Sequence, residues 1–162
     1  MRWIALTFVL FFVAMISLPH PGWSQKMPPF WISNLKGETF HSRKQQTPYV
    51  ISFFFTSCEP CIQEIPRLHQ WMSKEFPHLP ILFIDPLGED SKEAIQEFAE
   101  TLKVPLEFFY HDPLGNIGKP LFKGKREFPT IVGIKEGEVL FRYGKFDDPI
   151  MKEMRRHLSQ TP

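Results

Sequence analysis

The pattern of apolar and polar positions divides the chain into short elements of alternating type. Residues 49–56 (YVISFFFT) form an almost wholly apolar run rich in aromatic and β-branched side chains, which is typical of a strand buried on both faces. Directly after this run, apolar side chains recur at helical spacing up to about residue 76, and they are Ile62, Ile65, Leu68, Trp71 and Met72. We therefore expect a central strand that leads into a long amphipathic helix.

The same alternation continues further along the chain. Residues 81–85 (ILFID) predict a second strand, and residues 106–110 predict a third. Between them, residues 92–102 have one apolar helical face made of Ala94, Ile95, Phe98, Ala99 and Leu102. Strands that alternate with helices in this way form a parallel sheet with right-handed crossovers.

The last part of the chain predicts a hairpin and a final helix. Residues 130–135 (TIVGIK) and 139–144 (VLFRYG) read as two strands joined by a turn at residues 136–137. A helix from about residue 148 to 158 closes the chain. The predicted fold class is therefore α/β, with a central mixed β-sheet flanked by helices.

Composition and charge narrow the class of protein. Of the 162 residues, 43% are apolar and 23% are charged, with 19 basic and 18 acidic side chains. This is the profile of a soluble globular chain, and the near-neutral charge argues against nucleic acid as a partner. Residues 25–162 are enough to bury one hydrophobic core, so we expect them to form one domain.

The N-terminal segment predicts export. Residues 1–24 begin with Arg2, continue through an apolar run over residues 3–18 and end with the small residues Gly22 and Ser24, which is the pattern of a secretory signal peptide. An uncleaved membrane anchor is the alternative, although a helix of about 16 residues spans only about 24 Å of a hydrocarbon core of about 30 Å. We expect a periplasmic or otherwise extracytoplasmic protein, whose thiols lie in an oxidising compartment.

Cys58 and Cys61 are the only cysteines, and they lie close together in the stretch TSCEPC. A bridge between them closes a very short loop and would stabilise the fold by only about 2 kcal/mol. Half of a zinc site is a second explanation, but the six histidines are scattered and lack the short pairing of zinc ligands. A redox pair that opens and closes is the third explanation, and it is the one we favour.

The predicted helix places both cysteines in its first turn. Unpaired N–H groups and the helix dipole stabilise a thiolate at this end of a helix, so Cys58 is expected to be the attacking thiol. Cys61, one turn further on, is expected to be more buried and to act as the resolving thiol. Pro60 suits the first turn, where a missing N–H costs little, and the carboxylate of Glu59 is expected to oppose thiolate formation at Cys58.

Several stretches of the chain together form a recognisable set: PPFWISNLKGETF, FFFTSCEPC, CIQEIPRLHQ and FPTIVGIKEGEVL. With them the chain resembles the thioredoxin-like thiol:disulfide oxidoreductases, over about residues 28–158. Within that family it is similar to the exported, membrane-linked TlpA/ResA type, which includes cytochrome c maturation reductases. The tetrapeptide Cys-Glu-Pro-Cys followed by Glu64 and Pro66 is fairly specific to this type. The resemblance implies a thioredoxin fold with an N-terminal extension and a central helix-strand insert.

Further expectations rest on this resemblance alone. Pro129 would be a cis-proline packed against the disulfide, and the backbone of Phe128 would pair with substrate. Without the resemblance, the sequence would leave Pro129 trans, because X-Pro bonds are cis in only about 5% of cases in folded proteins. The Cys58–Cys61 disulfide would be the redox group, with no further cofactor and no metal. The partners would be a protein disulfide substrate, such as a cytochrome c precursor, and a membrane thiol-disulfide electron donor, and the protein would be a monomer.

The sequence departs from the family pattern at two positions. Ser52 stands where thioredoxin has a buried aspartate, and Ser57 stands where a tryptophan usually precedes the first cysteine. The usual proton acceptor is therefore missing. Glu64 lies one helical turn beyond Cys61 and could replace it, with a pKa raised by partial burial. The alternative is a solvated glutamate on the helix surface.

Other functions stay open at this point. An oxidase or isomerase would use the same residues with the opposite electron flow. A peroxidase fits less well, because peroxiredoxins place a threonine three residues before the reactive cysteine and Thr56 lies two before Cys58. Copper-binding modules of the thioredoxin fold separate their cysteines by three residues and add a histidine ligand, and a purely structural interaction domain is a further alternative.

A cluster of basic residues predicts either a solvated loop or a docking site for an acidic partner, and its members are Lys119, Lys123, Lys125 and Arg126.

We predict that the mature protein begins at Gln25, because Gly22 and Ser24 supply the small residues that a signal peptidase requires. Intact-mass measurement of the soluble and membrane fractions tests this start site. A full-length species confined to the membrane fraction would show instead that residues 3–18 form an anchor.

Overall fold

The structure is a computed structural model that describes residues 25–122 and 124–159, so the predicted signal peptide lies outside the described residues. The strands of its central sheet are β3 (Tyr49–Phe53), β4 (Ile81–Asp85), β5 (Phe109–His111), β6 (Thr130–Lys135) and β7 (Glu138–Tyr143). They lie side by side in the order β5-β4-β3-β6-β7. β3, β4 and β5 are parallel, whereas β6 is antiparallel to both β3 and β7. The sheet is therefore mixed, as predicted.

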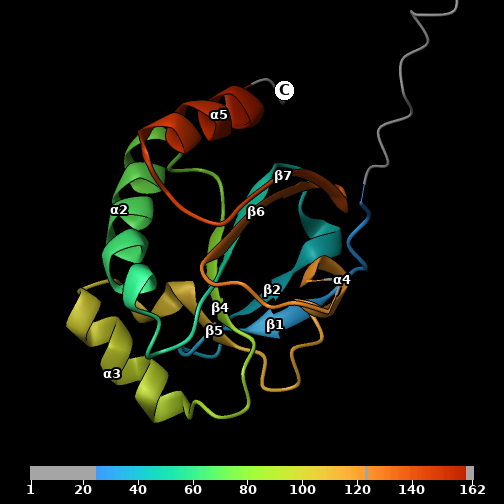
Figure 1. The fold of residues 1–162 in the computed structure, drawn as a ribbon. Coiled ribbons are helices and arrows are strands. Elements are labelled where there is room, and N and C mark those ends of the chain that lie inside the picture. The colour runs from blue at the N-terminus through green and yellow to red at the C-terminus, as the bar shows by residue number, and fades with distance from the viewer. Residues whose placement is uncertain (1–24, 123, 160–162) are drawn as a thin grey trace, which may run out of the picture.

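Helices and a small hairpin cover the two faces of this sheet (Figure 1). One face carries α2 (Glu59–Glu75), α3 (Lys92–Leu102) and α5 (Asp148–Ser159). The other face carries the hairpin of β1 (Trp31–Ser33) and β2 (Thr39–His41), together with the short helix α4 (Lys119–Phe122). Two 3₁₀ helices, η2 (Ser42–Lys44) and η3 (Leu106–Phe108), complete the elements. The hairpin is the N-terminal extension that the resemblance implied.

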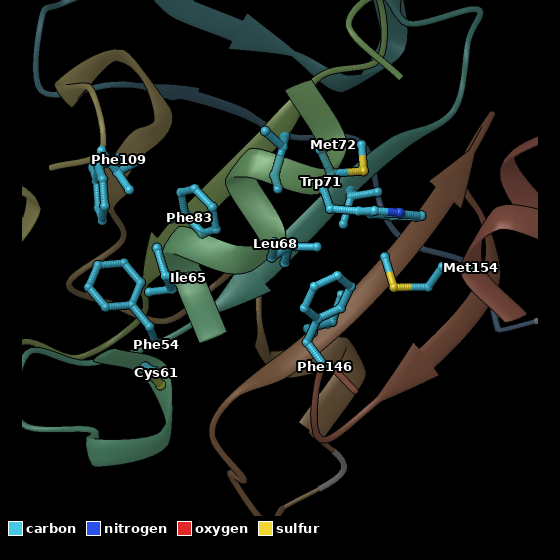
Figure 2. Close-up of a cluster of buried hydrophobic side chains, with 14 of the residues drawn as sticks. Phe54, Cys61, Ile65, Leu68, Trp71, Met72, Phe83, Phe109, Phe146 and Met154 are labelled. Atoms are coloured by element: carbon cyan, nitrogen blue, oxygen red, sulfur yellow. The ribbon is translucent and has the colours of Figure 1, made fainter. Parts of the chain in front are cut away.

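Side chains alternate along β3 and produce one hydrophobic core on each side of the sheet. Val50 and Phe54 pack on the side of α2, in the core drawn in Figure 2. Tyr49, Ile51 and Phe53 pack on the opposite side, against the hairpin and α4. All five are at most 1% exposed. Because two cores hold β3, the position of the chain at its carboxyl end is fixed from both sides.

The predicted helices are confirmed with small changes at their ends. α3 has the predicted limits, and α2 ends at Glu75, one residue before the predicted end. α5 extends to Ser159, one residue beyond the predicted end. Within residues 25–122 and 124–159, no helix is long and apolar enough to cross a membrane.

The prediction of a strand over residues 49–56 was too long. β3 ends at Phe53, the N–H of Phe54 makes one more bond to the carbonyl of Ile84 on β4 (3.1 Å), and residues 55–57 then turn toward α2. The apolar run continues to Phe55 because Phe54 still packs in the core on the α2 side and Phe55 lies against it. Hydrophobicity therefore reports burial here and does not report strand pairing.

The prediction of a strand over residues 106–110 was partly wrong. Its first half forms η3, and β5 begins only at Phe109. The carbonyl of Glu107 accepts a hydrogen bond from the side-chain amide of Asn34 (3.0 Å), so this segment bonds to the hairpin and not to β4. The strand at residues 81–85 has the predicted limits.

β6 and β7 form the predicted hairpin through a tight turn at Glu136 and Gly137. Both residues have a left-handed backbone, with φ of 49° and 82°. A two-residue turn of this kind matches the twist of the strands, and glycine adopts the conformation without a steric penalty. The predicted turn is therefore confirmed, and the glycine at residue 137 in the sequence accounts for it.

Candidate functional site

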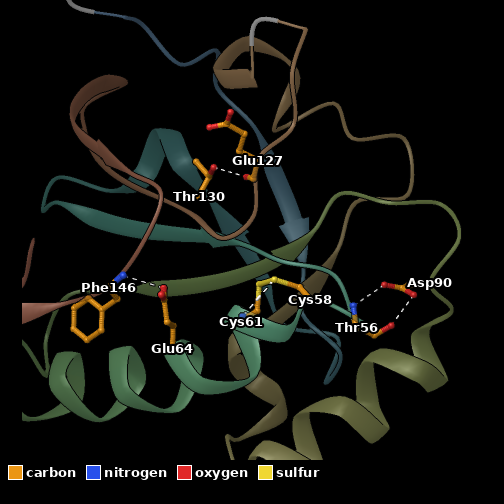
Figure 3. The surroundings of a disulfide bond; sticks show 8 residues. All are labelled: Thr56, Cys58, Cys61, Glu64, Asp90, Glu127, Thr130 and Phe146. Carbon is orange, nitrogen blue, oxygen red and sulfur yellow. Dashed lines mark hydrogen bonds between the residues drawn. A yellow bond between two sulfur atoms is a disulfide. The ribbon is translucent and has the colours of Figure 1, made fainter.

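A disulfide joins Cys58 and Cys61 at the edge of the sheet where β3 leads into α2 (Figure 3). The S–S distance is 1.97 Å, and the two Cα atoms are 5.3 Å apart. Cys58 is 2% exposed and Cys61 is 0% exposed, and both belong to the core on the α2 side. Cys61 is the more buried residue, as predicted, but the difference is small.

Cys58 is the N-cap of α2, one position before the helix, and Cys61 is the third helical residue. The backbone N–H of Cys61 donates a hydrogen bond to Sγ of Cys58 (3.3 Å). The N–H of Cys58 donates to the carbonyl of Phe55 (3.0 Å), which closes the turn before the helix. Pro60 is the second helical residue, where no N–H is needed, and Glu59 before it is exposed. This geometry directs a backbone donor and the helix dipole at Cys58 and supports it as the attacking thiol.

The Phe128–Pro129 peptide bond is cis, as the resemblance implied. The hydroxyl of Thr130 donates a hydrogen bond back to the carbonyl of Glu127 (2.6 Å). This bond joins the two residues that flank the Phe128–Pro129 dipeptide. The ring of Phe128 meets the ring of Phe55 edge to face, with centroids 5.2 Å apart. The loop before β6 is thus packed against the turn before α2. A role for Phe128 and Pro129 in substrate binding stays a prediction.

Glu64 is half-buried and points toward the loop after β7 (Figure 3). Its Oε2 accepts a hydrogen bond from the backbone N–H of Phe146 (2.9 Å). Burial raises the pKa of Glu64, although the bond from Phe146 and the charges of Arg67 and Lys145 act in the opposite direction. The carboxyl is therefore not the solvated surface group of the alternative interpretation. Its role as proton acceptor for Cys61 stays a prediction.

A carboxylate that the sequence analysis did not identify holds the turn before the cysteines. Oδ2 of Asp90 accepts from the backbone N–H of Thr56 (2.8 Å), and Oδ1 accepts from the Thr56 hydroxyl (2.7 Å) (Figure 3). Asp85 is fully buried at the end of β4, and burial together with the neighbouring Asp90 raises its pKa to about 8. A polar residue that ends an apolar strand of a parallel sheet is a signal that could have identified Asp85. Nothing in the sequence paired Asp90 with Thr56, because 34 positions separate them.

The remaining predicted positions lie around this centre. Ser52, which replaces the buried aspartate, is 1% exposed on β3, and Ser57 is exposed. In the basic cluster, Lys119 donates a hydrogen bond to Asn116 (2.8 Å) and Lys125 pairs with Glu127 (3.0 Å). Lys123 lies outside the described residues. Within the described ranges, no three His, Cys, Asp or Glu side chains are grouped so that they could hold a metal ion.

Solved structures that share the fold of this chain include proteins described as thioredoxins and disulfide oxidoreductases. A thioredoxin from Neisseria meningitidis is 24% identical, with a TM-score of 0.69 over 85% of this chain and 91% of that one. A secreted Mycobacterium tuberculosis disulfide oxidoreductase is 19% identical, with a TM-score of 0.63 over 81% and 95%. A SCO1/SenC family lipoprotein from Bacillus anthracis is 14% identical, with a TM-score of 0.67 over 89% and 99%.

The comparisons show the fold. No protein-family model matches the sequence, and no curated protein matches it. The structural similarity covers most of each chain, and the mixed sheet with helices on its faces is the thioredoxin fold. The predicted fold class is therefore confirmed.

We predict that Glu64→Gln leaves the fold intact, because the carboxamide oxygen can still accept the Phe146 N–H. Burial raises the pKa of Glu64, so the folded chain binds this proton more tightly than the unfolded chain. The resulting stabilisation is complete below the unfolded pKa of 4.5 and is lost as the pH rises through the higher folded value. The Glu64→Gln variant should therefore lose less stability than the wild type over that interval, measured by urea unfolding at a series of pH values.

Two further variants separate titration from packing. Gln63 is exposed on the same turn of α2, so Gln63→Ala should follow the pH dependence of the wild type. Glu64→Ala removes the acceptor for Phe146 and should cost about 1 kcal/mol throughout. Equal pH dependence of Glu64→Gln and the wild type would contradict the prediction.

Proposed function

We propose that the chain is an exported thiol:disulfide oxidoreductase that reduces a disulfide of a protein substrate such as a cytochrome c precursor. The observation that carries the proposal is a Cys-x-x-Cys disulfide at the N-terminus of α2, beside a cis-proline loop. The disulfide oxidoreductases among the structural neighbours, one of them secreted, support both the chemistry and the location. Cleavage after residue 24 would release residues 25–162 outside the cytoplasm.

The reaction starts from the dithiol form. The thiolate of Cys58 attacks one sulfur of the substrate disulfide, a new S–S bond forms, and the other substrate sulfur leaves as a thiolate. Cys61 then loses its proton and attacks Sγ of Cys58, which releases the second substrate thiolate and restores the Cys58–Cys61 disulfide. Two electrons pass from the dithiol to the substrate. A membrane thiol-disulfide transporter would return two electrons for the next cycle.

Side chains around the disulfide are assigned supporting roles. Glu64 would take the proton that Cys61 loses, since a carboxyl with a raised pKa is a better acceptor near neutral pH than an ordinary one. The backbone of Phe128 would pair with an extended substrate segment beside Pro129. The ring of Phe128 lies against that of Phe55, so a substrate that binds there also meets the turn that leads to Cys58.

The direction of electron flow is argued from charge. A helix N-terminus stabilises the thiolate and by itself makes a pair oxidising. Glu59 beside Cys58 acts against this, and so does Glu64 when it is ionised. Both carboxylates destabilise the reduced form and make the dithiol a better electron donor. Oxidase or isomerase activity is the second candidate, because it would use the same pair, and a copper-binding module is a third.

The mixed-disulfide intermediate tests the roles of the two cysteines. Cys61→Ser should accumulate a covalent adduct with a protein disulfide, whereas Cys58→Ser should trap none, because only Cys58 attacks the substrate. Non-reducing gel electrophoresis and intact mass detect the adduct. Each variant is the control for the other, and an adduct formed only by Cys58→Ser would reverse the assignment.

The reduction potential tests the direction of electron flow. We expect a value nearer the roughly −270 mV of a reducing thioredoxin than the roughly −120 mV of a dedicated oxidant. Equilibration with glutathione or dithiothreitol buffers, read by thiol-specific mass labelling, gives the value. A potential at the oxidising end would reject the reductase and favour an oxidase or isomerase. Copper bound in stoichiometric amount by the purified protein would favour the third candidate.

A further inference from the structure

One fully buried carboxyl group, Asp85, and one half-buried carboxyl group, Asp90, lie near the turn that precedes Cys58. Asp90 holds Thr56 with two hydrogen bonds, one to the backbone N–H and one to the hydroxyl. Thr56 is two residues before Cys58, and the turn between Phe55 and Cys58 is closed by one backbone hydrogen bond. Asp90 comes from the connection between β4 and α3, so it joins a distant part of the chain to the turn that carries the N-cap cysteine.

Asp85 supports Asp90 from inside the protein. It is 0% exposed at the carboxyl end of β4, and its Oδ1 accepts from the backbone N–H of Leu87 (2.8 Å). Its Oδ2 receives no hydrogen bond from any N–H or O–H group of the described residues. That oxygen would be satisfied if it carried a proton and donated to Asp90, the neighbouring group that shifts the pKa of Asp85. Two neighbouring carboxyl groups in this arrangement would share one proton.

The charges around the pair favour this protonation state. Burial, followed by the hydrogen bond to Asp90, raises the pKa of Asp85 to about 8. Burial acts in the same direction on Asp90, but the hydrogen bonds from Asp85 and Thr56 outweigh it and lower the pKa of Asp90. The titratable and charged side chains on the neighbouring segments are Glu59 on α2, Glu89 in the connection, Lys92 and Glu93 on α3, His111 on β5 and Asp112 after it.

We propose that Asp90 is a positioning residue for Cys58 and that the proton shared between Asp85 and Asp90 controls how firmly Asp90 holds Thr56. Protonated Asp85 donates to Asp90 and leaves both oxygens of Asp90 free to accept from Thr56. When Asp85 loses its proton, two carboxylates face each other in a buried site. Asp90 is the less buried of the two, so it moves and its bonds to Thr56 weaken. The turn is held at neutral pH and loosened above about pH 8.

The expected effect on catalysis rests on the proposed thiol-disulfide exchange. The expected effect on the position of the turn is independent of that proposed function. Cys58 reacts efficiently only while it stays at the N-cap, where the N–H of Cys61 points at its sulfur. A turn that moves would separate Cys58 from this donor. Above pH 8 the rate of exchange should therefore fall below the value expected from the thiolate fraction alone.

The amide proton of Thr56 reports the state of the pair directly. In the oxidised protein neither cysteine titrates, so NMR chemical shifts between pH 5.5 and 9.5 isolate the carboxyl groups. The wild-type Thr56 amide should shift with an inflection near pH 8. In Asp85→Asn that inflection should be absent, because the carboxamide can donate the same bond to Asp90 and accept from Leu87 but does not titrate. Every other side chain is the same in the two proteins, so their difference belongs to Asp85.

A matched control comes from a second buried carboxyl at the same edge of the sheet. Asp112 is 9% exposed, and its Oδ2 accepts from the backbone N–H of Ile117 (2.8 Å), so it bonds to a different segment from the one that Asp90 holds. Asp112→Asn should therefore leave the inflection of the Thr56 amide unchanged. Thr56→Ser keeps both bonds to Asp90 and should keep the inflection, whereas Asp90→Asn should remove it and displace the amide shift at every pH.

Reaction of reduced Cys61→Ser protein with oxidised glutathione measures the effect on Cys58. Adding Asp85→Asn should leave the rate within twofold of the parent at pH 6.5 and make it about threefold to tenfold faster at pH 9, as expected for one retained hydrogen bond. Adding Thr56→Val should slow the reaction at both pH values.

A wild-type Thr56 amide without an inflection between pH 7 and 9, or equal rates with and without Asp85→Asn at pH 9, would overturn the proposal. Loss of activity on protein disulfides alone, with these responses intact, would reject only the proposed substrate.

Discussion

The structure depends on one junction, at which β3 ends and α2 begins. β3 is packed on both faces, so its carboxyl end cannot shift without disturbing two cores. α2 packs its apolar face on one of those cores and is equally fixed. The short turn between them therefore presents Cys58 at the N-cap in a defined position. A nucleophilic sulfur needs both the backbone donors of a helix end and a place near the surface, and this junction supplies both.

Three further contacts fix this junction from different parts of the chain. Glu64 bonds to the loop after β7, Thr130 closes the loop around the cis bond, and Asp90 holds the turn itself. Each uses a polar side chain to bind a backbone group that no strand or helix satisfies. The surroundings of the disulfide are therefore rigid on three sides. The small exposure of Cys58 follows from the same packing.

The sequence was sufficient for features that arise from local patterns. The helical spacing gave α2 and α3, the apolar runs gave β3 and β4, and the residues Glu136 and Gly137 gave the hairpin turn. It failed where a distant segment decides the local structure. The first half of the third predicted strand forms η3 and bonds to Asn34 of the distant hairpin, and only the resemblance predicted the cis bond before Pro129. The contact of Asp90 with Thr56 was missed because hydrogen bonds between distant segments leave no periodic signal.

The roles assigned to Glu64 place opposing demands on one carboxyl. As a proton acceptor it works best with a raised pKa, which burial provides. As a charge that makes the dithiol a stronger electron donor it must be ionised, and a raised pKa works against that. The hydrogen bond from Phe146 and the charges of Arg67 and Lys145 favour the ionised form and limit the rise. Because Glu59 is exposed and free of the burial that affects Glu64, the reducing character that we propose depends chiefly on Glu59. Under this proposal Glu64 would move protons, and the two functions would be divided between two carboxylates on the same helix.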